Sequence, residues 1–257
     1  MTNQATFETE GIVKLYASAE QLQKPEETIL SILGDRLKNM AMLDLGVGGG
    51  RTTAHFAHRV HEYVAVDYAH NMIEACKRKF PALAAHQAFK VCDARSMPMF
   101  TDRAFDFILF SFNGLDYLSH EDRIKALREI KRLGKPGGYF CFSSHNLNSD
   151  IEHSCRIAWT PNPVKLAYRV GRYGLFKLVT RNVKAVRRRS DFAVINDGAH
   201  HFRSRTYYIK PQAQIDQLTG LGFTNIRLFS LSDGRELTDR SAMATSTDSW
   251  LYYLCGI

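Results

Sequence analysis

The sequence has no apolar run long enough to cross a membrane, because no stretch reaches the roughly 18 consecutive apolar residues that a spanning helix needs. Residues 1–10 are polar and acidic, so they lack the basic and apolar regions of a secretory signal peptide. Only five cysteines occur, and none are spaced as CxxC. We therefore expect buried free thiols in the reducing cytoplasm. These cysteines are Cys76, Cys92, Cys141, Cys155 and Cys255.

A metal-binding cluster is missing as well. His55, His58 and His61 recur at helical spacing, but no carboxylate or thiol partner accompanies them. We interpret these histidines as a surface stripe and expect no metal. The sequence also contains no internal repeat and no low-complexity tract.

What the sequence does have is an uneven distribution of charge. The net charge is +8, with 45% hydrophobic and 23% charged residues, which is ordinary for a globular protein. Between Asp150 and Lys210 there are 13 Lys/Arg and 4 Asp/Glu residues, so this segment carries +9 and the rest of the chain −1. Any partner attracted by charge should therefore meet this segment.

Strand and helix patterns alternate along the first half of the chain. Apolar runs at 42–45, 63–67, 88–92, 105–112 and 139–144 predict strands, and the patterns at 51–60, 70–80 and 119–133 predict helices. Residues 9–39 predict one or two more helices, 212–221 another, and 223–231 and 250–255 two further strands. The expected fold is α/β, a doubly wound, seven-stranded Rossmann-like sheet.

The alternation stops between 146 and 205, where the residues are mixed, basic and aromatic. We interpret this stretch as an insertion on the core, placed as a basic lid. The predicted organisation is an N-terminal helical cap at 1–40, an α/β core at 41–145, the lid at 146–205, and the C-terminal part of the core sheet at 206–257.

A glycine-rich turn follows the first predicted strand. Gly46, Gly48 and Gly50 lie between that strand and a helix, where the backbone can approach a ligand and the helix N-terminus offers free N–H groups. Asp67 ends the second strand, 17 residues after Gly50, where a carboxylate accepts hydrogen bonds from ribose hydroxyls. A dinucleotide cofactor fits this pattern equally well, and a tight packing turn without a ligand is the alternative.

Two features favour S-adenosylmethionine (SAM) over a dinucleotide. Arg51 stands where the GxGxxG dinucleotide motif has its last glycine. The third strand also ends in an acid, Asp93, followed by Ala94. A carboxylate at that position can accept a hydrogen bond from an adenine amino group.

Five segments in the same order resemble the successive motifs of class I SAM-dependent methyltransferases. They are 42–53 (MLDLGVGGGRTT), 64–77 (VAVDYAHNMIEACK), 91–94 (VCDA), 105–118 (FDFILFSFNGLDYL) and 133–146 (LGKPGGYFCFSSHN). The resemblance covers residues 10–146 well and 205–257 more loosely. The SFNGLDYL stretch and the KPGG turn are most similar to small-molecule O- and N-methyltransferases.

The resemblance implies a set of residues that hold SAM and its product S-adenosylhomocysteine (SAH). They are Gly46, Gly48, Gly50 and Arg51 at the loop, Asp67, Tyr68, Met72, Asp93 and Ala94 along the ribose and adenine, and Ser111 and Asn113 beside the methionine part. The alternatives are core packing for Tyr68 and Met72, and a turn cap for Asp93.

Candidates for the chemistry come from three places in the sequence. His145 directly follows the fifth strand and is the first candidate for a general base towards an oxygen acceptor, with Asn113 beside the transferred methyl group. His201, in a cluster with Arg203 and Arg205, is placed to roof the site. Tyr16 resembles a tyrosine that many such enzymes fold over the cofactor. A loop histidine, a solvated loop and a buried helix tyrosine are the respective alternatives.

The predicted function is methyl transfer from SAM to a hydroxyl or amine of a small metabolite, anionic and sugar- or natural-product-like. An RNA methyltransferase is the first alternative, although residues 112–115 (FNGL) lack the Asn/Asp-Pro-Pro-aromatic motif of many base-modifying enzymes. A non-catalytic SAM-binding scaffold is the second. The basic stretch 165–189 has four interpretations: a lid for an anionic acceptor, a peripheral membrane contact, a structural or oligomer face, and a nucleic-acid surface.

Overall fold

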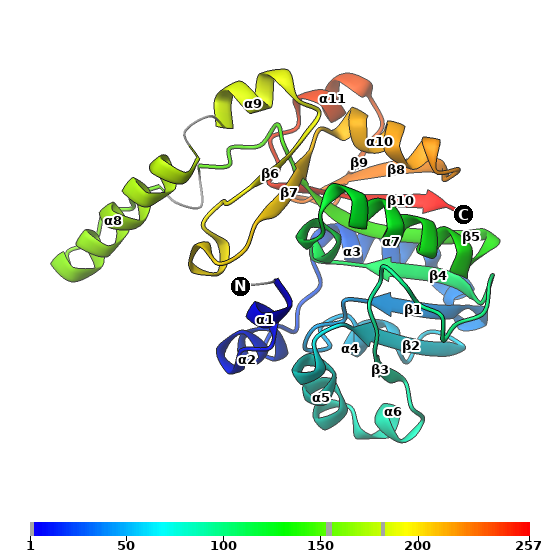
Figure 1. Cartoon of the computed structure of the whole chain (residues 1–257). Helices are drawn as coiled ribbons and strands as arrows, with labels where there is room; N and C mark the ends of the chain where they lie inside the picture. The colour runs from blue at the N-terminus through cyan, green and yellow to red at the C-terminus, as the bar shows by residue number, and fades with distance from the viewer. Residues whose placement is uncertain (1–2, 153–155, 181–182) are drawn as a thin grey trace.

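The centre of the molecule is a ten-stranded sheet, seen in a computed structural model that describes residues 3–152, 156–180 and 183–257 (Figure 1). The main strand order is β3-β2-β1-β4-β5-β10-β8-β9, and the β6–β7 hairpin pairs with the end of β5. The first five strands along this order, from β3 to β5, all pair with one another in parallel. These five strands are β1 (Ala41–Leu45), β2 (Glu62–Asp67), β3 (Phe89–Val91), β4 (Phe105–Phe110) and β5 (Gly134–Asn146).

The far side of the sheet is antiparallel. β10 (Trp250–Gly256) pairs with β5 and with β8 (Thr224–Ser230), and β8 pairs with the short β9 (Glu236–Leu237). β10 lies between β5 and β8, and its residues from Leu251 to Cys255 are all buried. Burial on both faces is what a continuous apolar run in a strand predicts.

Helices cover both faces of the sheet, as the alternation predicted. One apolar core joins the strands to α7 (His120–Leu133) and α10 (Pro211–Gly220). The second core joins them to α3 (Lys24–Leu33), α4 (Thr53–Phe56) and α5 (His70–Lys79). The remaining short elements of this part are η1 (Gly34–Asn39), α6 (Pro81–Ala85), η2 (Gly114–Tyr117) and α11 (Arg240–Thr245).

Local signals set where the main helices begin. The Ser119 hydroxyl accepts a hydrogen bond from the Asp122 backbone N–H at 3.2 Å, which caps α7. At α3, Gln23 and Glu26 form a reciprocal capping box around Pro25. The first two helices, α1 (Asn3–Phe7) and α2 (Glu10–Ala17), pack Phe7 and Val13 against residues 69–75 at the start of α5.

The predicted count of seven strands was wrong, because the described chain has ten. Two of the extra strands, β6 (Phe192–Ile195) and β7 (Thr206–Ile209), lie at the end of the segment interpreted as irregular and at its boundary. Their antiparallel pairing spans a ten-residue connection that contains η4 (Ala199–Phe202). Strands of only four residues are too short for the alternation of apolar and polar residues to be recognised in the sequence. The third, β9, has only two residues.

The rest of the basic segment is helical. α8 (Pro163–Val179) and α9 (Val183–Arg189) extend away from the sheet on the side of the β6–β7 hairpin (Figure 1). β7 pairs with β5 through His145 and Tyr208, which ties the hairpin to the core sheet. The boundaries predicted for the cap, core and lid stay predictions.

Four of the cysteines, Cys76, Cys92, Cys141 and Cys255, are free and buried, while Cys155 lies outside the described residues. Within the described ranges, no helix has the length and apolar character that spanning a membrane would require. No group of three or more His, Cys, Asp or Glu side chains in those ranges is arranged to hold a metal ion. A cytoplasmic location stays a prediction.

Candidate active site

A cavity of about 1280 Å³ opens at the carboxyl ends of β1, β2 and β4. This is the edge at which ligands bind in doubly wound sheets. Its wall is formed by the glycine loop, the ends of β2 and β4, residues 92–95, the N-terminal segments and the loop of the β6–β7 hairpin. The structure brings many of the predicted site residues to this wall: Tyr16, Gly46, Gly48, Arg51, Asp67, Tyr68, Met72, Asp93, Ala94 and Ser111.

The glycine loop is held by the carboxylate of Asp67. One oxygen of Asp67 accepts a hydrogen bond from the Gly48 N–H at 2.9 Å, and the other accepts from the Ala69 N–H at 2.8 Å. Gly46 has a φ of +59°, and a Cβ there would lie 2.7 Å from the Phe110 ring. Glycine is therefore required at this turn for both its backbone angle and its missing side chain. Gly50 does not line the cavity and instead packs over Phe80.

Asp67 is nearly buried, and burial raises the pKa of its carboxyl to about 6, although hydrogen bonds from backbone N–H groups oppose the rise. A carboxylate oxygen can accept more than one hydrogen bond. Each oxygen of Asp67 therefore retains capacity for a ligand hydroxyl on the cavity side.

The N-terminal chain lies directly on the glycine loop. A Cβ on Gly49 would be 2.3 Å from the Ala17 nitrogen and 2.5 Å from the Tyr16 carbonyl carbon. The Tyr16 ring contacts Phe112 edge-on, with the ring centroids 6.1 Å apart. Burial raises the pKa of the Tyr16 hydroxyl to about 12, so it stays protonated and can donate a hydrogen bond at neutral pH.

Arg51 pairs with the buried carboxylate of Glu26. Its Nη2 lies 2.7 Å from Glu26 Oε1, and its guanidinium lies over the Phe112 ring at 5.2 Å. Glu26 also accepts from the Tyr252 hydroxyl at 2.9 Å and is hydrogen-bonded by Ser111. Burial alone would raise the pKa of Glu26, but the Arg51 hydrogen bonds hold it below its usual value.

This network ties together the N-terminal segment, the loop, the end of β4 and β10. Glu26 and Tyr252 are separated by 226 residues, so no local pattern could have joined them. The terminal N–H groups of Arg51 donate to Glu26 and Ser111. The predicted role of Arg51 in cofactor binding stays a prediction.

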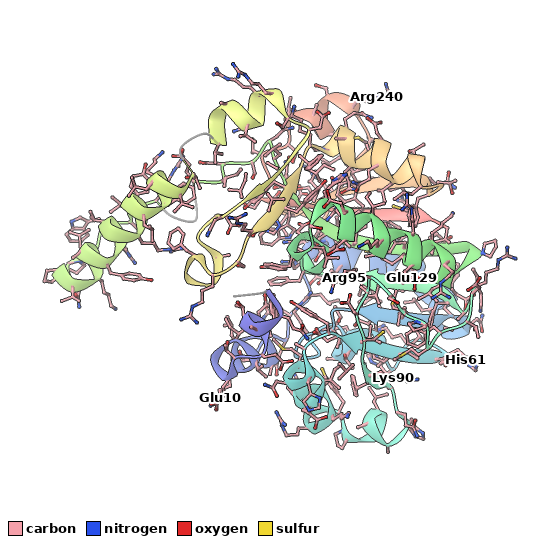
Figure 2. The ribbon with its side chains drawn as sticks, viewed as in Figure 1. Glu10, His61, Lys90, Arg95, Glu129 and Arg240 are labelled. Atoms are coloured by element: carbon pink, nitrogen blue, oxygen red, sulfur yellow. The ribbon has the colours of Figure 1, made fainter. Side chains whose placement is uncertain are left out.

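A second acid, Asp93, lies on the part of the cavity wall formed by residues 92–95. Its oxygens accept from the Arg95 guanidinium at 2.6 to 3.0 Å, and Oδ1 accepts from the Arg95 backbone N–H at 2.9 Å. Burial alone would raise the pKa of the Asp93 carboxyl, but Arg95 holds it below its usual value. Arg95, labelled in Figure 2, also donates to the Asp122 carboxylate at 2.8 Å, near the start of α7. Asp93 thus stabilises its own turn and lines the cavity, so the two interpretations of it are compatible.

His145 lies beside the cavity but does not line it, and the same is true of Asn113. The His145 Nδ1 is 2.7 Å from Asp116 Oδ2, and its Nε2 is 3.5 Å from the Asn113 amide nitrogen. Phe112 and Asn113 both adopt left-handed backbone angles, with φ of +53° and +60°, at the end of β4. In the described chain the buried Oδ1 of Asn113 has no hydrogen-bond partner.

Asp116 is the centre of a buried network that sequence reasoning missed. It is fully buried and accepts from the Arg123 guanidinium at 2.6 Å, the Ser144 hydroxyl at 2.8 Å and the His145 N–H at 2.6 Å. Arg123 is fully buried as well and also donates to Gln214 at 2.5 Å. Nothing in the SFNGLDYL stretch marks Asp116 as a buried ion-pair partner.

The part of the cavity wall farthest along the chain is formed by the loop of the β6–β7 hairpin. Asn196 and residues 202–205 line the cavity there, and Arg203 and Arg205 are exposed. No acidic side chain in the described ranges lies within salt-bridge distance of either arginine. His201 belongs to η4, but its side chain lies outside the described side chains, as does that of His200.

Comparison with known proteins agrees with this geometry. Residues 42–138 match the methyltransferase domain family. The chain is 28% identical over 236 residues to the biotin biosynthesis bifunctional protein BioHC of Cellvibrio japonicus, which covers 88% of this chain and 44% of that protein. It is 34% identical over 97 residues to the demethylmenaquinone methyltransferase of Renibacterium salmoninarum, covering 38% of each.

A solved structure with a similar fold is the 1,6-didemethyltoxoflavin-N1-methyltransferase of Burkholderia thailandensis, bound to 1,6-didemethyltoxoflavin and SAH. The TM-score is 0.58 at 15% identity, and the match covers 98% of this chain and 87% of that one. The chain spans less than half the length of the two curated relatives above. Residues 42–138 therefore match a methyltransferase domain, and the chain shares its fold with SAM-dependent methyltransferases of known structure.

Proposed function

We propose that the protein transfers a methyl group from SAM to a small, anionic acceptor. The observation that carries the proposal is one cavity whose wall holds the glycine loop, Asp67 and Asp93 together with Arg203 and Arg205. The curated relative named for demethylmenaquinone and the solved structure with bound 1,6-didemethyltoxoflavin both concern small acceptors.

The cofactor end of the cavity fits SAM. Gly46 and Gly48 leave the loop backbone open, and Asp67 has acceptor capacity for ribose hydroxyls. Tyr68 and Met72 line the wall between the two acids, where an adenine ring would lie. When bound there, SAM supplies an activated methyl group, and the residues contribute mainly by positioning.

The acceptor end favours a negative charge. Arg203 and Arg205 both reach the cavity wall without a carboxylate partner among the described residues. Arginine binds carboxylate and phosphate groups through paired, charge-assisted hydrogen bonds. We therefore infer a phosphate or carboxylate on the acceptor, located near the hairpin loop.

The acceptor atom itself is a hydroxyl or an amine. A hydroxyl needs a base, and His145, oriented by Asp116, is the proposed one. However, no histidine with a described side chain lines the cavity, which favours a neutral amine that needs no base. The His145→Ala variant separates the two: a loss in turnover of roughly 10²–10⁴-fold supports an oxygen acceptor, and nearly full turnover supports an amine.

The first test is calorimetric titration with SAM, SAH and NAD in parallel. We expect SAM and SAH to bind and NAD not to bind; NAD binding without SAM binding would overturn the proposal. A panel of phosphorylated, carboxylated and neutral amines and alcohols is then assayed for SAH release.

For an acceptor found this way, the double change Arg203→Gln and Arg205→Gln should raise KM at least roughly tenfold, because each lost charged hydrogen bond is worth about 1.5–3 kcal/mol. SAH affinity should stay unchanged. The matched control is Lys38→Gln with Arg128→Gln, which removes two exposed charges elsewhere. An unchanged KM in the Arg203/Arg205 variant would refute the anionic subsite.

A further inference from the structure

Exposed hydrophobic side chains are concentrated in one region of the molecule. In the described ranges, ten of the fourteen large hydrophobic residues with exposed side chains lie between Ile157 and Val194. The most exposed are Trp159 at 79%, Val164 at 77% and Leu178 at 64%. Scattered exposed hydrophobics are normal, but a concentration of this kind marks an interaction surface.

On α8 these residues form a continuous stripe. Val164, Tyr168, Gly171, Leu175 and Leu178 follow one another at alternating steps of four and three residues, and all five are exposed. Steps of this size place side chains on one face of a helix. We call these five residues the α8 stripe.

The other face of α8 is the one that holds the helix to the protein. Phe176 is fully buried in a small core with Leu147, Ile195 and Tyr208, and Tyr173 packs against the same core. The α8 stripe therefore lies on the exposed side of the helix, opposite the side that carries Phe176. Figure 1 shows α8 extending outward from the sheet. Phe202 packs on this small core and also lines the cavity, which joins α8 to the acceptor end.

The charge around the α8 stripe is mostly positive, with Glu152 paired to Lys177 of α8 at 2.6 Å. From Arg156 to Ser190 the sequence contains ten Lys/Arg residues and no Asp or Glu. Lys165 and Arg172 lie three residues before and four residues after Tyr168, so they border the stripe. No acidic side chain in the described chain is within salt-bridge distance of Lys165, Arg172, Arg188 or Arg189.

We propose that the α8 stripe and its basic border dock on an anionic lipid surface. An apolar face flanked by Lys and Arg, with a tyrosine and a nearby exposed tryptophan, is what a helix lying in a membrane interface presents. Arg169 donates to the Ala158 carbonyl at 2.6 Å, which ties the segment that carries Trp159 to α8.

The positive charge of this segment favours an anionic lipid surface over a second copy of the chain as the partner of the α8 stripe. A symmetric pair of α8 helices would bring two basic segments together, and residues 156–190 contain no Asp or Glu that could offset the repulsion from across the contact. An anionic surface instead attracts each exposed Lys or Arg by about 1 kcal/mol, or roughly fivefold in affinity per residue.

The test is cosedimentation of the full chain with vesicles of phosphatidylcholine alone or with about 30% phosphatidylglycerol added. We expect binding only to the anionic vesicles and weaker binding as salt is raised. Leu175→Glu with Leu178→Glu should reduce binding at least about tenfold by removing apolar insertion. Lys165→Gln with Arg172→Gln, which removes the basic border, should reduce it roughly 10- to 30-fold.

Matched controls separate the stripe from general surface changes. Met99→Glu alters a side chain that is 51% exposed on another loop, and Lys38→Gln with Arg128→Gln removes two charges elsewhere. Both controls should bind vesicles as the unchanged chain does, and every variant should bind SAH normally. Equal binding to neutral vesicles, binding to neither kind, or a dimer in solution that Leu175→Glu with Leu178→Glu dissociates would each overturn the proposal.

Discussion

The two ends of the cavity are built in different ways. At the cofactor end, short loops after consecutive parallel strands supply Gly46, Asp67 and Asp93, and the backbone N–H groups of Gly48 and Ala69 take part directly. At the acceptor end, the wall comes from the loop of the β6–β7 hairpin, far along the chain from the strand ends.

This difference in construction determines how freely the residues at each end of the cavity can be substituted. Recognition through strand ends and backbone groups depends on a fixed local pattern, so the cofactor end has little freedom. The acceptor wall depends on side chains of a hairpin that only pairs at the tip of β5, through His145 and Asn146. Loops carried on a rigid scaffold are where specificity changes most easily.

The largest predicted effect concerns the buried network behind the acceptor end. Asp116→Ala leaves the Arg123 guanidinium, which is fully buried, without its carboxylate partner at 2.6 Å. Removing one partner of a buried ion pair costs about 3–5 kcal/mol. The free energy of unfolding, measured by denaturant titration, should fall by that amount.

Asp102→Ala is the matched control for that change. Asp102 pairs with Arg132 at 2.7 Å, but its side chain is 70% exposed, so its loss should cost at most about 1 kcal/mol. Similar losses in the two variants would show that burial of the Asp116 network does not control stability.

Local features of the fold could be predicted from the sequence, whereas long-range pairs could not, for a physical reason. Strand periodicity and the glycine turn are local signals, and each was found where it was expected. The Arg51–Glu26 and Arg123–Asp116 pairs instead depend on where α3 and η2 pack. The strand count failed in the same way, since β6 and β7 become strands only by pairing with each other and with β5.

The next prediction concerns the contact between the N-terminal chain and the glycine loop. Gly49→Ala would place a Cβ 2.3 Å from the Ala17 nitrogen, and backbone cannot move aside as a side chain does. We expect a loss of about 1–3 kcal/mol in stability and a clear drop in SAH affinity by calorimetry. Gly11→Ala is the control, because a Cβ there meets nothing within 4 Å. If SAH affinity survives in Gly49→Ala, the N-terminal chain does not help to form the cofactor end.

Asp67→Ala tests the cofactor end directly. The variant loses the acceptor proposed for the ribose hydroxyls and also frees the Gly48 N–H. SAM and SAH binding should weaken by about 1–3 kcal/mol, the scale of a hydrogen bond to a charged group. Asp35→Ala, which changes an exposed acid on η1, should bind normally. Full affinity in a folded Asp67→Ala protein would refute the ribose assignment.

The smallest predicted effect is a pH dependence with opposite signs for stability and binding. Burial raises the pKa of Asp67 from its usual 3.8 to about 6, so its contribution to stability is fully present below pH 3.8 and is lost as the pH rises through 6. Ribose hydroxyls instead need the ionised acceptor, so SAH affinity should fall a few-fold as the pH drops through 6. Asp44, whose pKa burial also raises to about 6, would give the same stability slope, so calorimetry at several pH values is the measurement that discriminates. In Asp67→Asn the pH dependence of binding should vanish; if it persists, another group controls the cofactor end.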